Sequence, residues 1–401
     1  MGERFEHARA LDERCVMHTY ARKPVMFVSG QGMRLMSDEG REYLDFVSGI
    51  GAVNLGHAHP AVAEAIARQA SRLVHVSNLF YVEHRAELAC DVVALAGGAR
   101  RVFFANSGAE ATEAAIKLAR RWAREHKPEA FQVVTTLRSF HGRTLAALAA
   151  TGQPSKQEAF APLPQGFVHV PFGDVEALDA ALDETVAAFM LEVVQGEGGV
   201  WPATRDYLEA AARLCRERGV LLVIDEVQTG FFRTGPAFAY QAFGLDPDIF
   251  TLAKAMANGL PIGAVVAKNE VSEAFKPGDH GSTFGGGPLV CAGARATLAA
   301  LTDEDLGARA VVAGQYLRAG LADIESRNGA LYDVRGAGLM VGCTLARPQA
   351  AEVAARLLEA GIVVNSIGEE HLRLLPPLVC GTSEIDTLLS ALADVLEEVA
   401  S

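Results

Sequence analysis

The amine of Lys254 is the side chain best suited to covalent chemistry, because it lies in a stretch of mostly small and apolar residues at 250–263. Desolvation by such neighbours lowers the pKa of a lysine, and a neutral amine can act as a nucleophile or form a Schiff base. The competing interpretation is a surface lysine whose stem packs on apolar groups. The glycine-containing loop in which it lies modestly favours a functional lysine.

Polar residues directly follow two other apolar runs. After residues 102–104 the chain passes through Ser107, Gly108 and Ala109 into a helical pattern, and the free amides and dipole of a helix start suit a phosphate. A Ser/Gly helix start without a ligand fits this pattern as well. Asp225 follows the apolar run at 220–224. It could cap a loop, or it could hold the protonated pyridine nitrogen of a pyridoxal ring that serves as an electron sink.

Three further segments carry reactive or cationic side chains. Residues 140–144 (FHGRT) combine an aromatic ring, an imidazole and a guanidinium, and residues 280–288 are rich in glycine and hydroxyl groups. Either segment could be an ordinary turn. Arg373 stands in the apolar run 372–378, where an unpaired guanidinium is unfavourable, so we expect a carboxylate partner. An internal salt bridge would satisfy that expectation without any ligand.

The elements that must position these residues are those of an α/β protein. Short extended segments at 25–28, 33–36 and 41–46 predict a small antiparallel meander. From about residue 60, apolar runs at 102–104, 133–134, 189–194 and 220–224 alternate with helical patterns, which predicts a mostly parallel sheet covered by helices. Ligands of such sheets bind beyond the carboxyl ends of the strands.

Both ends of the chain are expected to build a second, smaller unit. The tail predicts strands near 339–345 and 362–365 and a final helix that begins near Ser383. We expect it to pack against the N-terminal meander. The predicted division is 1–59 for the N-terminal part of a small α+β domain, 60–303 for a large domain, and 304–401 for the C-terminal part of the small domain.

Composition excludes several classes of function. The 401 residues are 50% hydrophobic and carry a net charge of −13 without a basic block, so neither nucleic acid nor an anionic membrane is an expected partner. The longest apolar runs are far shorter than the ~20 residues of a membrane span. Charged residues precede any apolar stretch at the N-terminus, which favours a cytoplasmic location. Six cysteines are scattered singly, which indicates buried thiols and neither a metal site nor disulfides.

Six motifs in order carry a resemblance that runs from about Pro24 to the last helix. They are NSGAEA at 106–111, FHGRT at 140–144, QGEGG at 195–199, DEVQTG at 225–230, TLAK at 251–254 and PGDHGSTF at 277–284. Together they resemble the class III aminotransferases, which are pyridoxal-phosphate enzymes of fold type I. Within that family the chain is most similar to the members that act on acetylornithine.

The resemblance implies a role for each cofactor-binding residue. Lys254 would hold pyridoxal 5′-phosphate covalently and then move a proton, and Asp225 would keep the pyridine nitrogen protonated. Phe140 would stack on the ring, and Val227 and Gln228 would border it. The phosphate would bind to Ser107, Gly108 and Ala109, with Thr283 supplied by the second subunit of a homodimer.

The resemblance also implies how two substrates share the site. Arg143 would bind the α-carboxylate of N2-acetyl-L-ornithine or the distal carboxylate of glutamate, and Arg373 would bind the glutamate α-carboxylate. Glu197 would pair with Arg373 until glutamate replaces it, and Ser282 would lie near the acylated amine. The implied reaction moves the δ-amino group of N2-acetyl-L-ornithine to 2-oxoglutarate, giving N-acetyl-L-glutamate 5-semialdehyde and L-glutamate, a step of arginine biosynthesis.

Several alternatives stay open at this point. N-succinylornithine, N-succinyl-diaminopimelate, ornithine or 4-aminobutyrate could be the amine donor, and glutamate-1-semialdehyde aminomutase shares the fold and the lysine. A nucleotide-linked dehydrogenase would need a G-x-G-x-x-G after a strand, which is missing. Departures from the family pattern at Thr112, Gly287 and Phe231-Phe232 bear on substrate preference and leave the reaction type unaffected.

Overall fold

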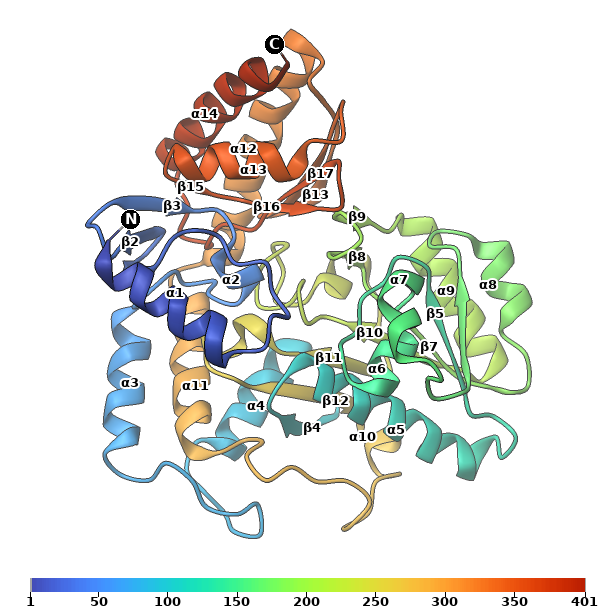
Figure 1. The fold of residues 1–401 in the computed structure, drawn as a ribbon. Coiled ribbons are helices and arrows are strands. Elements are labelled where there is room, and N and C mark those ends of the chain that lie inside the picture. The colour runs from blue at the N-terminus through green and yellow to red at the C-terminus, as the bar shows by residue number, and fades with distance from the viewer. Residues whose placement is uncertain (1, 401) are drawn as a thin grey trace.

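The computed structural model describes residues 2–400 and has a large central sheet with smaller sheets packed above one end of it (Figure 1). The central sheet has the strand order β4-β12-β11-β10-β7-β5-β6. Its strands are β4 (Arg100–Ala105), β5 (Gln132–Thr136), β6 (Phe167–Val170), β7 (Val186–Leu191), β10 (Leu221–Asp225), β11 (Ile249–Leu252) and β12 (Gly263–Lys268). β12 alone runs in the direction opposite to the other six strands of this sheet, so the predicted mostly parallel α/β sheet is confirmed.

Side chains that alternate along the strands fill a core on each face of this sheet. In β10, Leu221 and Val223 pack with the small residues of α5 (Gly108–His126), whereas Leu222 and Ile224 belong to the core on the other face. Helix α9 (Arg205–Arg218) packs on β10 and ends at Gly219, whose φ of 60° is the left-handed conformation that glycine adopts most easily.

The remaining helices of the large part surround the sheet and its loops. Helices α3 and α4 both pack against α11. The bounds are α3 (Pro60–Ala70), α4 (Arg85–Ala96), α6 (Leu145–Ala150), α7 (Pro154–Gln157), α8 (Val175–Ala181), α10 (Asn269–Ser272), α11 (Pro288–Asp303), and the 3₁₀ turns η1 (Glu158–Phe160), η2 (Ala239–Phe243) and η3 (Lys254–Ala257). The short strands β8 (Val194–Gln195) and β9 (Trp201–Pro202) form a separate hairpin-like pair.

Segments from both ends of the chain build the smaller part, as predicted. Strands β1 (Phe27–Gln31), β2 (Arg34–Ser37) and β3 (Glu42–Asp45) form the expected antiparallel meander, and β15 (Ile362–Val363) pairs in parallel with β3. A second sheet contains β13 (Leu331–Ala337), β14 (Met340–Leu345), β17 (His371–Leu374) and β16 (Asn365–Ile367). The helices of the smaller part are α2 (Ser48–Gly51), α12 (Leu306–Asn328), α13 (Ala350–Glu359) and α14 (Thr382–Ala400). The division of the chain at residues 59 and 303 stays a prediction.

Three local expectations were incomplete or wrong. The polar N-terminal segment forms α1 (Glu3–Cys15), which the sequence analysis missed because the helix buries only Phe5. The apolar run at 189–194 is interrupted, since β7 ends at Leu191 and Glu192 lies in the bend before β8. All six cysteines are free thiols, but Cys15 and Cys90 are exposed, so the expectation of uniformly buried thiols was wrong.

The described residues also bear on two other classes of protein, those that span membranes and those that hold metal clusters. Within residues 2–400, no helix combines the length and the apolar character that crossing a membrane requires. Over the same residues, no group of three or more His, Cys, Asp or Glu side chains is arranged to hold a metal ion.

Candidate active site

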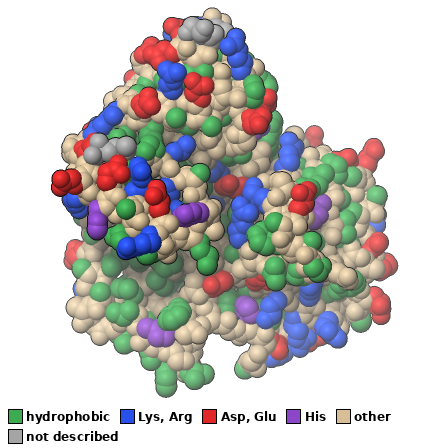
Figure 2. Space-filling model, viewed as in Figure 1, with side chains coloured by type: hydrophobic (Ala, Val, Ile, Leu, Met, Phe, Trp, Pro, Cys, Tyr) green, Lys and Arg blue, Asp and Glu red, His purple; other side chains and the backbone are tan. Residues whose placement is uncertain are grey.

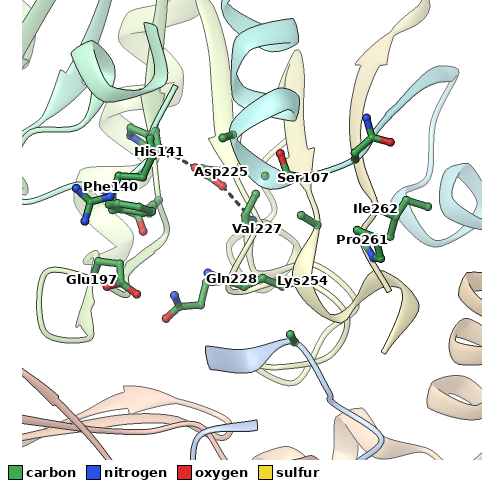
Figure 3. Close-up of a pocket in the computed structure, with 18 of the residues that line it drawn as sticks. Ser107, Phe140, His141, Glu197, Asp225, Val227, Gln228, Lys254, Pro261 and Ile262 are labelled. Atoms are coloured by element: carbon green, nitrogen blue, oxygen red, sulfur yellow. Dashed lines mark hydrogen bonds and ion pairs between the residues drawn. The ribbon is translucent and has the colours of Figure 1, made fainter. Parts of the chain in front are cut away.

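A cavity of about 370 Å³ opens at the carboxyl ends of the central strands (Figure 3). It gathers side chains that follow β4, β5, β7, β10 and β11, which is where an α/β sheet concentrates its ligand contacts. The predicted residues that line it are Ser107, Gly108, Ala109, Phe140, Arg143, Glu197, Asp225, Val227, Gln228 and Lys254. The structure therefore brings ten separately predicted residues into one cavity.

Lys254 lies two residues after the end of β11 and lines the cavity from the start of η3. Its φ of 43° is unusual for a residue with a side chain and points to a conformation that the surrounding fold imposes. Burial lowers the pKa of the Lys254 amine, although the carboxylates of Glu197, Asp225 and Glu192 partly oppose this effect. Among the described residues, its amine has no recorded hydrogen-bond or ion-pair partner. A neutral amine that faces a cavity can carry out covalent and proton-transfer chemistry.

Asp225, the last residue of β10, is almost fully buried and is held from several sides. His141 Nδ1 lies 2.7 Å from its Oδ2, and Thr251 Oγ1 donates to its Oδ1 over 3.0 Å. Desolvation would lower the pKa of His141, but the hydrogen bond and charge of Asp225 and the charge of Glu192 outweigh it and raise that pKa. Figure 3 shows the His141–Asp225 pair beside Val227 at the back of the cavity. A carboxylate fixed in this way can hold a cation in front of it.

The start of α5 forms a cradle for an anion. Ser107 caps the helix by accepting a hydrogen bond from Glu110 N over 3.2 Å, and the N–H groups of the first turn have no partner within the helix. A Cβ atom on Gly108 would lie 2.9 Å from Val227 Cγ1, so only glycine fits at that approach. Gly142, with a φ of 141°, similarly lets the loop after β5 contact Ala109.

An ion pair between Glu197 and Arg373 closes one side of the site. Arg373 Nη1 lies 2.5 Å from Glu197 Oε1, and the Arg373 side chain is only 1% exposed, against 25% for Glu197. Arg373 also donates to Asn365 Oδ1 and, over 3.2 Å, to Gln228 Oε1. Burial would raise the pKa of Glu197, but the charge and hydrogen bond of Arg373 outweigh it and lower that pKa. The carboxylate partner that the sequence required for Arg373 is therefore Glu197.

Arg143 is exposed and lines the cavity, and its Cζ lies 5.5 Å from the centre of the Phe140 ring. No ion-pair partner of Arg143 is recorded among the described residues. Figure 3 shows the Phe140 ring between His141 and Glu197. An aromatic face beside a free guanidinium suits a planar ligand that carries a carboxylate.

Ser282 and Thr283 lie apart from this cavity within one chain. They line a second cavity of about 690 Å³ together with His75, Asn78 and Arg85. Ser282 Oγ accepts a hydrogen bond from Asn106 Nδ2 over 3.0 Å, and Thr283 is exposed. Of the predicted site residues, these two are the ones that a single chain does not bring to Lys254.

Glu192 is a cavity residue for which the sequence analysis predicted no role. It is buried, and its carboxylate accepts hydrogen bonds from Phe140 N over 3.0 Å and from Gly196 N over 3.3 Å. Burial raises the pKa of Glu192 to about 7. The available signal was a single carboxylate inside the apolar run at 189–194. Glu192 joins the loop that carries Phe140 to the loop that carries Glu197.

This fold and these side chains define a class of protein, the pyridoxal-phosphate-dependent transferases of fold type I. A partner-free lysine, a carboxylate at a strand end and a helix start with free amides are the groups that an aldehyde, a pyridine nitrogen and a phosphate require. The chain belongs to the class-III aminotransferase family, whose family model matches residues 16–396. It is a pyridoxal-phosphate-dependent aminotransferase.

Individual relatives cover almost the whole chain. The chain is 46% identical to the acetylornithine aminotransferase of Caldanaerobacter subterraneus over 389 residues, which are 97% of this chain and 98% of that protein. It is 48% identical to the acetylornithine aminotransferase of Gloeobacter violaceus over 96% of both chains. The crystal structure of the ornithine aminotransferase of Toxoplasma gondii is similar to it with a TM-score of 0.95 and 36% identity, covering 99% of this chain and 96% of that one.

Proposed function

We propose that this aminotransferase moves the δ-amino group of N2-acetyl-L-ornithine to 2-oxoglutarate, giving N-acetyl-L-glutamate 5-semialdehyde and L-glutamate, as in arginine biosynthesis. The observation that carries the proposal is the ion pair between Glu197 and the buried Arg373 beside Lys254, with the unpaired Arg143 lining the same cavity. Such a site can present one cationic group or two, depending on where Glu197 lies. The names of the relatives at 46% and 48% identity agree with this substrate.

The residues proposed to hold pyridoxal phosphate fit its three polar groups. Lys254 would take the aldehyde carbon, Asp225 the protonated ring nitrogen, and Ser107, Gly108 and Ala109 the phosphate. Phe140 would stack on the ring, with Val227 and Gln228 at its borders. When bound, the cofactor supplies an electron sink for the bond that breaks at the amine-bearing carbon.

Lys254 would carry the proton in this reaction. Once its Nζ is released, the amine would take the proton from the amine-bearing carbon of the substrate and deliver it to the cofactor side, which makes it a general base and then a general acid. Its lowered pKa supports this role because a larger fraction of the amine is neutral near pH 7. His141, behind Asp225, would keep that carboxylate oriented toward the ring nitrogen.

Two arginines would distinguish the two half-reactions. Arg143 would bind the carboxylate that lies far from the reacting carbon, which is the α-carboxylate of acetylornithine or the distal carboxylate of glutamate. While Glu197 neutralises Arg373, the uncharged part of the acetylornithine chain next to the δ-amino group can approach Arg373. When glutamate binds, its α-carboxylate would replace Glu197 on Arg373 as a bidentate partner.

A homodimer in the cytoplasm is part of the proposal. In one chain Thr283 is exposed and lines the second cavity. From there it would reach the phosphate site of a partner subunit, and Ser282 would approach the acylated end of the substrate from the same segment. Exposed apolar side chains lie near these residues, including Leu79, Phe80 and Phe284, as expected for a face that another copy covers. The division into domains at residues 59 and 303 belongs to this proposal too.

The test follows the absorbance of the bound cofactor while N-acetylornithine is added to the purified holoenzyme. Conversion from the aldehyde to the amine form by acetylornithine, much faster than by ornithine or 4-aminobutyrate, is the expected result. Faster conversion by ornithine would make this an ornithine aminotransferase, as in the structurally similar Toxoplasma gondii enzyme. N-succinylornithine and N-succinyl-diaminopimelate serve as parallel substrates that define the preferred acyl group.

A further inference from the structure

A second cation lies beside the Phe140 ring, in addition to Arg143. Lys156, in α7, is half-buried, and its Nζ lies 5.6 Å from the centre of that ring, while Arg143 Cζ lies 5.5 Å from it. Phe140 and Arg143 both line the cavity of Lys254. Figure 2 shows basic side chains along the hollow that opens at the centre of this face. Two cations therefore share one aromatic ring that lines the substrate site.

No acidic side chain within the described residues forms an ion pair with Lys156. Its recorded hydrogen bond goes to Gln153 Oε1, and Gln153 Nε2 in turn donates to Ser139 O over 3.0 Å. This arrangement holds the ammonium next to the loop that carries Phe140. A half-buried ammonium near other cations is unfavourable unless an anion binds among them.

The local charges agree with a missing anion. Burial lowers the pKa of Lys156, and although the Glu197 carboxylate is the largest charge effect and raises that pKa, Arg143 and Arg373 lower it again and the net shift is downward. An incoming carboxylate would reverse this balance by stabilising the ammonium. The chain as a whole carries a net charge of −13, so a cationic cluster at this wall is a local feature that general composition does not explain.

We propose that Lys156 is a specificity-determining residue that donates a hydrogen bond to the carboxylate held by Arg143. This inference rests on the proposed function of the same site and adds a second cation to it. Arg143 provides a planar, directional partner, and Lys156 provides a movable point charge. The substrates it selects are those with a carboxylate remote from the reacting carbon, namely N-acetylornithine and the pair of glutamate and 2-oxoglutarate.

The experiment measures kcat and KM of the holoenzyme for each substrate in wild type, Lys156→Gln and Lys156→Arg. The exposed Lys276→Gln is the matched control, and Gln153→Ala tests whether Lys156 acts only by holding Gln153. We expect Lys156→Gln to raise KM for N-acetylornithine and for 2-oxoglutarate about ten-fold, since one charge-assisted hydrogen bond is lost, with kcat changed less than about two-fold. Lys156→Arg should restore most of the affinity.

The α-carboxamide of N-acetylornithine serves as a substrate analogue that distinguishes recognition of the carboxylate charge by Lys156 from packing of the Lys156 side chain. Its KM should be the same in wild type and Lys156→Gln, because it lacks the carboxylate. Unchanged KM values for the natural substrates in Lys156→Gln would overturn the inference. An equal loss for the carboxamide, or full reproduction of the effect by Gln153→Ala, would overturn it as well. If the wild type accepts glutamate but not acetylornithine, the proposed amino donor is refuted. The role of Lys156 is then still decided by comparing the KM of glutamate in wild type and Lys156→Gln.

Discussion

Replacement of Glu197 by alanine tests the two-substrate mechanism most directly. The substitution removes the carboxylate that lies 2.5 Å from Arg373 Nη1 and leaves the guanidinium with Asn365 and Gln228 as partners. N-Acetylornithine would then meet a permanently charged Arg373, and its own carboxylate could bind there in a non-productive orientation. Glutamate would meet an arginine that no longer has to release Glu197. The variant is therefore expected to favour glutamate.

The exposure of the two partners sets the size of the effect. Removing one member of a fully buried ion pair costs about 3–5 kcal/mol, whereas exposed pairs contribute about 0–1 kcal/mol. Arg373 is 1% exposed but Glu197 is 25% exposed, and Arg373 keeps two amide partners. An intermediate value of about 2 kcal/mol corresponds to about a 30-fold change in the ratio of kcat/KM for glutamate to kcat/KM for acetylornithine.

The two half-reactions can be measured separately, from the absorbance of the bound cofactor after rapid mixing with each amino donor. Glu197→Gln is the matched control, because an amide oxygen can still accept from Arg373 while the charge is absent, and it should give an intermediate ratio. Since Arg373 lowers the pKa of Glu197, the wild-type ratio should stay constant as the pH falls toward the usual glutamate range. Equal losses for both substrates in Glu197→Ala would refute the exchange mechanism and leave Glu197 with a structural role.

Three further predictions concern the catalytic lysine and two buried ionisable groups. Lys254→Ala should reduce transamination by at least about 10³-fold with unchanged circular dichroism, and unaltered turnover would remove Lys254 from the mechanism. Burial raises the pKa of Glu226 to about 7, so the folded chain keeps a proton that the unfolded chain releases, and stability should fall as pH rises from about 4.5 to about 7. Glu226→Gln should flatten that dependence in urea unfolding between pH 5 and 8, and parallel curves for variant and wild type would contradict it. Arg233 is fully buried and donates to Asn54 Oδ1 and Pro376 O, so Arg233→Met should lower the free energy of unfolding by about 3–5 kcal/mol, and a loss under 1 kcal/mol would argue against this role.

Local patterns in the sequence predicted the frame of the site well. The apolar run at 220–224 and the Ser/Gly helix start at 107–109 each follow from short-range chemistry, and each is present in the structure, as β10 and as the start of α5. The cavity follows from them because Asp225 ends one strand of the central sheet, and Ser107 and Lys254 each lie two residues beyond the end of another. The partner of Arg373 could also be anticipated as a carboxylate, since a guanidinium in an apolar run requires one.

What the sequence did not predict are contacts between segments far apart in the chain. Glu192 interrupts an apolar run, but its partners are the amides of Phe140 and Gly196, and no local pattern indicates that the loops after β5 and β8 would meet there. The same holds for Lys156, which lies in a short polar helix that resembles a surface turn until Phe140 and Arg143 are placed beside it. For Glu192 the decisive contacts are two backbone amides, and for Lys156 they are an aromatic ring and a neighbouring guanidinium. Such contacts appear only when the packing of distant segments is known, so residues of this kind are the ones that local sequence patterns identify last.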